Sequence, residues 1–153
     1  MNYCMRPEGR WIIGAKAAEI TGIDNAVADA FGVEFLVGIE IFLEMMDRAD
    51  IIVAHNIAYD IVVMRRAVFV YCEMTGQEYT DPFKGKTVCC TMMNSTELVK
   101  APPFKRGKWK WPRLEECLWH FFGEKLEGAH DALNDVKGCA KVYYHLRDDL
   151  KVL

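Results

Sequence analysis

Residues 50–60, with the sequence DIIVAHNIAYD, decide the fold class of this chain. The stretch opens on a short β-branched run that ends in polar residues, which predicts a buried strand over residues 50–55. From residue 57 to about residue 75 the pattern is helical, and Gly76 is placed to end that helix. A buried strand followed by a helix indicates an α/β fold, in which ligands bind beyond the carboxyl ends of the strands.

Three polar residues lie at this expected strand end and are candidate site residues: His55, Asn56 and Asp60. Asn56 and Asp60 are four positions apart, so they share one face of the helix near its N-terminus. On local grounds a purely structural interpretation is also open, in which Asn56 caps the helix and Asp60 complements its dipole.

The composition is that of one ordinary globular domain with a substantial core. The chain has 153 residues, of which 52% are apolar and 27% charged, and its formal net charge is −3. This apolar content excludes intrinsic disorder, and no apolar run reaches the ~18 residues of a membrane-spanning helix. No charged and apolar leader opens the sequence, and the six cysteines have neither a CxxC pair nor zinc-ligand spacing. We therefore expect reduced cysteines and a cytoplasmic protein.

Periodicity and glycine stops predict four further helices, at residues 15–21, 34–47, 112–122 and 131–146. The last of these should bury an apolar stripe made of Leu133, Val136, Ala140 and Tyr143. Two more strands are predicted at residues 3–13 and 87–91. Residues 92–111 contain two adjacent prolines and little periodicity, so we expect a long basic loop there.

A second polar segment, HDALND over residues 130–135, lies at the start of the last predicted helix. Asp131 suits the N-cap position, so His130 precedes the helix and Asp135 lies one turn inside it. A histidine at a helix start with a carboxylate one turn on is what a water-activating base beside a metal ligand would need. The alternative is that both residues form ordinary surface pairs.

Together, HNIAYD over residues 55–60 and HDALND over residues 130–135 resemble the second and third motifs of the DEDDh 3′–5′ exonucleases. This is the proofreading type of nuclease, named for four acidic residues and a histidine. The segments RPEGRWI and AAEITGID agree with the family as well. The run from Lys108 to Leu146 is similar to its phage and bacterial members, so the likeness covers nearly the whole chain.

This resemblance implies an α/β, ribonuclease H-like fold with a mixed sheet flanked by helices. It also implies that Asp60 and Asp135 are catalytic metal ligands and that His130 is the general base. In the family two divalent cations, Mg²⁺ or Mn²⁺, hold the scissile phosphate while the histidine activates the attacking water. The expected products are nucleoside 5′-monophosphates released from a 3′ end.

The first motif of the family, an Asp-x-Glu on the opening strand, is not found in this sequence. We therefore expect residues 1–153 to form a single exonuclease-type domain that is N-terminally incomplete and lacks its first strands. Three explanations are open: a fragment or late start, strands supplied by another chain, or a truncated pseudo-nuclease. Asp60 and Asp135 alone are few ligands for two cations, so the second metal site is in question and little or no activity is expected of the chain as given.

A basic segment is the candidate nucleic-acid contact. Residues 81–113 contain eight lysines and arginines against two acids, a net charge of +6, which leaves −9 on the other residues of a chain of −3. Cations alternate with aromatic residues in its second half, a combination that follows phosphates and stacks bases. Besides His55 and Asn56, the candidate nucleic-acid-binding residues are Lys105, Arg106, Lys108, Trp109 and Lys110. Trp111 is expected to be structural, because the Trp-Pro pair of similar proteins just precedes a helix.

The resemblance implies a role in replication, repair or phage DNA metabolism, in the cytoplasm of a bacterial or phage-infected cell. Nucleic acid is the expected partner, as single-stranded DNA 3′ ends, and a polymerase or a second copy of the chain are further candidates; no membrane partner is expected. The alternative function is a non-catalytic nucleic-acid-binding or interaction module on the same fold. The sequence contains neither the GxGxxG of dinucleotide-binding proteins nor the GxSxG of serine hydrolases.

Overall fold

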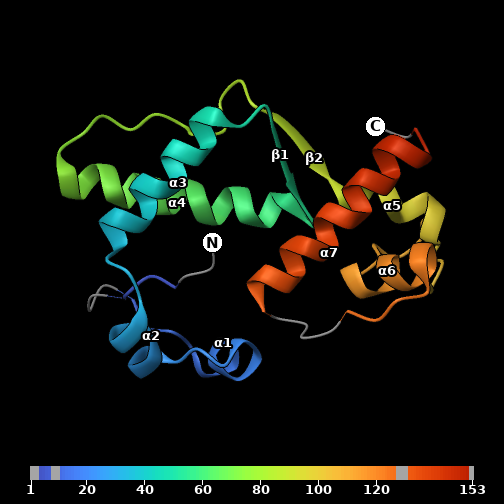
Figure 1. Cartoon of the computed structure of the whole chain (residues 1–153), viewed down its shortest axis with the longest axis horizontal. Coiled ribbons are helices and arrows are strands. Elements are labelled where there is room, and N and C mark those ends of the chain that lie inside the picture. The colour runs from blue at the N-terminus through green and yellow to red at the C-terminus, as the bar shows by residue number, and fades with distance from the viewer. Residues whose placement is uncertain (1–3, 8–10, 127–130, 152–153) are drawn as a thin grey trace. The chain divides into compact units, whose positions relative to one another are not determined.

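A computed structural model describes residues 4–7, 11–126 and 131–151 of the chain (Figure 1). The chain divides into two compact units, Met1–Asp50 with Ile61–Lys86, and Ile51–Asp60 with Thr87–Leu153. None of the described helices is long and apolar enough to cross a membrane. All six cysteines are free thiols, as expected.

The first unit is helical. It contains α1 (Ala15–Thr21), α2 (Asn25–Phe31), α3 (Phe35–Arg48) and most of α4 (Ile57–Thr75). Its core joins α3 to α4 through five buried residues: Phe35, Ile39, Val68, Tyr71 and Cys72. Helix α1 ends as predicted, at Gly22 in the left-handed conformation with φ 71°.

The second unit is built on two parallel strands, β1 (Ile51–Ala54) and β2 (Thr87–Cys90). Their register pairs Ile51 with Thr87 and Ala54 with Cys90, so the two strands end side by side. Three helices and a short π-helix accompany them: α5 (Thr91–Val99), α6 (Leu114–Phe122), α7 (Ala132–Tyr144) and η1 (His145–Asp149). Helix α7 packs against β1 and α6, and α6 packs against α5.

The core of the second unit lies between α6 and the α7–η1 segment. Its buried members are Cys117, Leu118, Val142 and Leu146. Gly138 allows the close approach of the two helices, because a Cβ atom there would lie 3.1 Å from Leu118 Cδ1. The carboxyl ends of β1 and β2 are thus held beside a well-packed helical layer.

These features confirm the predicted α/β fold class, with parallel pairing of the described strands. Helix α5 contradicts the loop predicted from residue 92, which begins only after Val99. The helix was hard to predict because two of its three buried residues, Thr91 and Ser95, are polar and leave no apolar period. Helix α2 was not predicted. In the described part of the predicted first strand, the only pairing is an isolated bridge from Met5 to Val33.

The apolar stripe predicted for the last helix is wrong in part. Leu133 and Val136 are 37% and 63% exposed, whereas Gly138, Cys139, Val142 and Tyr143 are buried. The buried face of α7 is therefore rotated from the predicted one, and Gly138 on that face allows the close approach of α6. As a result Val136 borders the candidate site.

Candidate functional site

The carboxyl ends of β1 and β2 are joined by side chains that directly follow each strand. His55 follows β1 and Thr91 follows β2, and the His55 Nδ1 atom lies 2.9 Å from Thr91 Oγ1. Asn56 turns the chain into α4 with a positive φ of 72°, a conformation that asparagine adopts more readily than most residues. The Thr91 hydroxyl is also 3.4 Å from the Ala54 carbonyl, so the strand ends form one connected polar cluster.

The other ring nitrogen of His55 reaches a third segment. His55 Nε2 lies 2.9 Å from the carbonyl oxygen of Pro112, just ahead of α6. Because that carbonyl can only accept, Nε2 is assigned the proton and donates it. Burial lowers the pKa of His55, which favours the neutral ring, so Nδ1 accepts from the Thr91 hydroxyl. His55 therefore ties β1, the start of α5 and the residues before α6 together.

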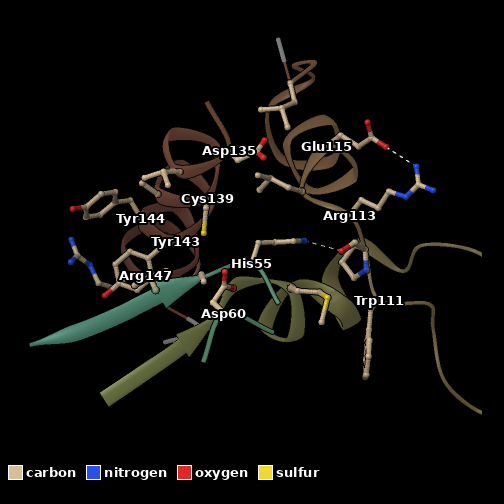
Figure 2. A pocket seen from close by; sticks show the side chains of 18 of the residues that line it. His55, Asp60, Trp111, Arg113, Glu115, Asp135, Cys139, Tyr143, Tyr144 and Arg147 are labelled. Carbon is tan, nitrogen blue, oxygen red and sulfur yellow. Dashed lines mark hydrogen bonds and ion pairs between the residues drawn. The ribbon is translucent and has the colours of Figure 1, made fainter. Parts of the chain in front are cut away.

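A cavity of about 1210 Å³ opens beside this cluster, within the second unit. Asp60 on the first turn of α4 and Asp135 on the first turn of α7 both line it (Figure 2). The α7 start is fixed by Asp131, whose side chain accepts from the backbone N–H groups of Leu133 and Asn134. The structure thus brings together the two acids that the sequence motifs single out.

The electrostatics of Asp60 favour a cation nearby. Partial burial raises the pKa of its carboxyl group, because a desolvated carboxylate is less stable than a hydrated one. Among the ion pairs of the described residues, none includes Asp60 or Asp135. Carboxylate oxygens that have no ion-pair partner are of the kind that hard divalent cations prefer as ligands.

The described residues contain no group of three or more histidine, cysteine, aspartate or glutamate side chains placed to hold a metal ion. Asp60 and Asp135 line one cavity, and their role as metal ligands stays a prediction. His130, the predicted general base, lies outside the described residues, so its role stays a prediction.

The basic segment forms an exposed hairpin at its tip. Lys105 and Lys108 exchange backbone hydrogen bonds of 2.9 and 3.0 Å, and Arg106 and Gly107 between them have φ angles of 51° and 76°. Two consecutive positive φ angles in a two-residue loop are typical of a type I′ turn. Lys105, Arg106 and Lys108 are exposed, and none of them has a carboxylate partner among the ion pairs of the described residues.

The residues that follow the hairpin differ from expectation. Trp109 is half-buried and contacts Phe104, with ring centroids 4.6 Å apart and ring planes tilted by 55°. Lys110 Nζ binds Glu116 Oε1 at 2.6 Å. Trp111 does not pack into the core as expected but is 64% exposed and lines the cavity. The neighbouring Pro112 is buried instead.

Further cavity residues, Arg113, Tyr144 and Arg147, are absent from the predicted set. Tyr144 and Arg147 follow Asp135 by nine and twelve positions, about 2.5 and 3.3 turns of a helix, so helical periodicity does not place them on the face of Asp135. The sequence therefore offered no signal that these residues border the same cavity. The predicted roles of His55 and Asn56 in nucleic-acid binding stay predictions.

Comparisons with known proteins bear on the family and the fold of the chain. The family model RNase_T, described as "Exonuclease", matches residues 5–143. The crystal structure of E. coli Exonuclease I in complex with a dA16 oligonucleotide is similar, with a TM-score of 0.71 and 18% sequence identity. That match covers 98% of this chain and 34% of Exonuclease I, so the chain spans about a third of the other protein's length. No curated protein matches the chain.

Proposed function

Because the chain belongs to the exonuclease family whose model matches residues 5–143, we propose that it is a metal-dependent 3′–5′ exonuclease domain. In this proposal it hydrolyses nucleic acid from the 3′ end to nucleoside 5′-monophosphates. The observation that carries the proposal is the position of Asp60 and Asp135, far apart in the sequence, on one cavity at the carboxyl edge of a parallel sheet.

In the proposed site, Asp60 and Asp135 hold a Mg²⁺ or Mn²⁺ ion. When bound, the ion supplies the positive charge that stabilises the phosphodiester as it is attacked. The family uses two such ions, whereas Asp60 and Asp135 are enough carboxylates for only one. We therefore expect weak activity. His130, which directly precedes the α7 N-cap residue in the sequence, accepts the proton of the attacking water.

The proposed substrate is single-stranded DNA presented by its 3′ end. The similar Exonuclease I was crystallised with a dA16 oligonucleotide. The exposed hairpin cations Lys105, Arg106 and Lys108 offer unneutralised positive charge for phosphates.

We place the protein, as one exonuclease-type domain, in the cytoplasm of a bacterial or phage-infected cell, where a polymerase or a second copy would be its partner in DNA replication and repair.

A degradation assay tests this function directly. The protein is incubated with single-stranded DNA labelled at its 5′ end, in Mn²⁺ and separately in EDTA. We expect a slow, metal-dependent ladder of products shortened from the 3′ end, and its loss in Asp135→Asn and Asp60→Asn. Asp29→Asn, a change of an acid on α2 of the first unit, is the matched control and should leave the ladder intact.

A second candidate is the non-catalytic nucleic-acid-binding module, which is favoured by the small number of candidate metal ligands, Asp60 and Asp135. The same assay separates the two functions when DNA binding is measured in parallel. Binding of the oligonucleotide without any Mn²⁺-dependent shortening would support the module. A ladder that persists unchanged in Asp135→Asn would contradict both the proposed site and the assignment of its ligands.

A further inference from the structure

Trp111 is the largest apolar side chain that borders the cavity and is left open to solvent. Burying a tryptophan normally removes a large apolar area from water, so a ring that stays 64% exposed forgoes that stabilisation. Among the ring contacts of the described residues, Trp109 contacts Phe104 in a tilted arrangement, whereas Trp111 takes part in none. Its indole face is therefore available to a ligand.

Exposure alone does not make a binding site, since Trp119 on α6 is 62% exposed as well. The position of Trp111 distinguishes the two residues. Trp111 lines the same cavity as Asp60 and Asp135, whereas Trp119 lines a different one. Trp111 also follows the basic hairpin at Lys105–Lys108 within a few residues.

The backbone at Trp111 is held in place from both sides. Before it, Lys110 is bound to Glu116 at 2.6 Å, and after it the Pro112 carbonyl accepts from His55 Nε2 at 2.9 Å. The ring is thus presented from a fixed segment, which lowers the entropic cost of binding a flat ligand. In the view of Figure 2, Trp111 lies on the opposite side of His55 from Tyr144 and Arg147.

We propose that Trp111 is a stacking platform for an unpaired nucleobase of the strand that enters the cavity. Every base has a π-face, so stacking of this kind tolerates any sequence but requires a base that is not already stacked in a duplex. The expected consequence is a preference for single-stranded over double-stranded nucleic acid. This inference rests on the proposed function in that the strand enters the cavity of Asp60 and Asp135.

The test measures binding rather than cleavage, in EDTA, with the full chain. Fluorescence anisotropy of a labelled twelve-nucleotide oligothymidylate gives the dissociation constant. We expect Trp111→Ala to weaken binding about tenfold, which corresponds to about 1.4 kcal/mol, and Trp111→Phe to retain most of the affinity. Trp119→Ala is the matched control and should bind as the wild type does.

A second measurement needs no variant, so it holds even if Trp111→Ala fails to fold. A 2-aminopurine base is placed at successive positions near the 3′ end, and its fluorescence should fall at one of them when wild-type protein binds. An oligonucleotide that is abasic at that position should bind about tenfold more weakly. The proposal is overturned by equal affinities of Trp111→Ala and wild type, by no quenching at any position, or by binding of blunt duplex as tight as that of the single strand.

These outcomes can be distinguished from failure of the proposed function. If the 2-aminopurine signal and the Trp111→Ala loss occur but Mn²⁺ produces no shortening, stacking holds and catalysis fails. If the ladder appears and depends on Asp135 while Trp111→Ala binds normally, catalysis holds and the stacking proposal is wrong.

Discussion

Replacement of His55 by alanine should destabilise the second unit, because this ring links three segments at the carboxyl edge of the sheet. The variant removes two hydrogen bonds of 2.9 Å, to Thr91 and to the Pro112 carbonyl. Each such bond contributes about 1 kcal/mol net, and the buried Pro112 carbonyl would lose its partner at a further cost of about 1 kcal/mol. The free energy of unfolding should therefore fall by about 3 kcal/mol, which lowers Tm by roughly 6–12 °C for a chain of this size.

The same residue should give the protein a pH dependence. Burial lowers the pKa of His55 in the folded state, whereas the unfolded ring titrates near its ordinary value of about 6.5. Below that pH the unfolded state binds a proton that the folded state binds less readily. The contribution of the neutral ring to the free energy of unfolding is therefore complete above about pH 6.5 and is lost as the pH falls below that value.

Urea unfolding followed by circular dichroism at pH 7.5 and pH 5.5 measures both effects. His55→Ala should be less stable at pH 7.5 and should show a smaller drop between the two pH values than the wild type. His120→Ala, a change of an exposed histidine on α6, is the control and should match the wild type. A loss of less than about 0.5 kcal/mol in His55→Ala would refute the linking role.

Three further predictions concern the core and the basic hairpin. Burial raises the pKa of the Cys117 thiol to about 11, so this thiol should make the wild type lose stability between about pH 9 and 11, as the unfolded thiol ionises first. Cys117→Ala should lose less over that range in urea unfolding, and parallel curves would contradict this. Gly138→Val should lower Tm, because a Cβ added there would lie 3.1 Å from Leu118 Cδ1 and overpacking costs about 1–3 kcal/mol. An unchanged Tm would show that α6 and α7 can separate freely. Replacing Lys105, Arg106 and Lys108 together by alanine should weaken oligonucleotide binding and reduce the slope of log K against log salt by about 2, and an unchanged slope would exclude the hairpin as a phosphate contact.

Local signals predicted the central βαβ unit well. Helix α4 has the predicted bounds, Ile57–Thr75, because Gly76 with φ 70° ends it. Strand β1 lies within the predicted residues 50–55, because a β-branched run of that length suits a strand, but the predicted burial is wrong: Ile51 is exposed and the other three residues are half-buried. Asp60 and Asp135 line one cavity, as the resemblance implies, because the helices that carry them both begin at that edge of the fold.

The errors have a common physical cause, which is that side-chain contacts between distant segments are not visible in a local pattern. Helix α5 buries Thr91 and Ser95, and its polar residues hid the helical period. Pro112 is buried, whereas the indole of Trp111 is 64% exposed. The pattern in residues 105–113 does not show this, and the Pro112 carbonyl binds His55, which is far away in the sequence.

His55 shows how a motif residue can act on a ligand without touching it. Its position beside Asn56 and Asp60 predicts a ligand contact, yet both ring nitrogens bind the protein itself. One of those bonds holds the segment that presents Trp111, so His55 is a positioning residue for the proposed stacking site. The His55→Gln side chain can still reach one of the two partners, so this variant should fold. It should then bind single-stranded DNA more weakly than wild type, and only when the oligonucleotide carries a base at the nucleotide that stacks on Trp111. Equal losses on the abasic oligonucleotide would instead place His55 in direct contact with the phosphates, as its motif alone predicts.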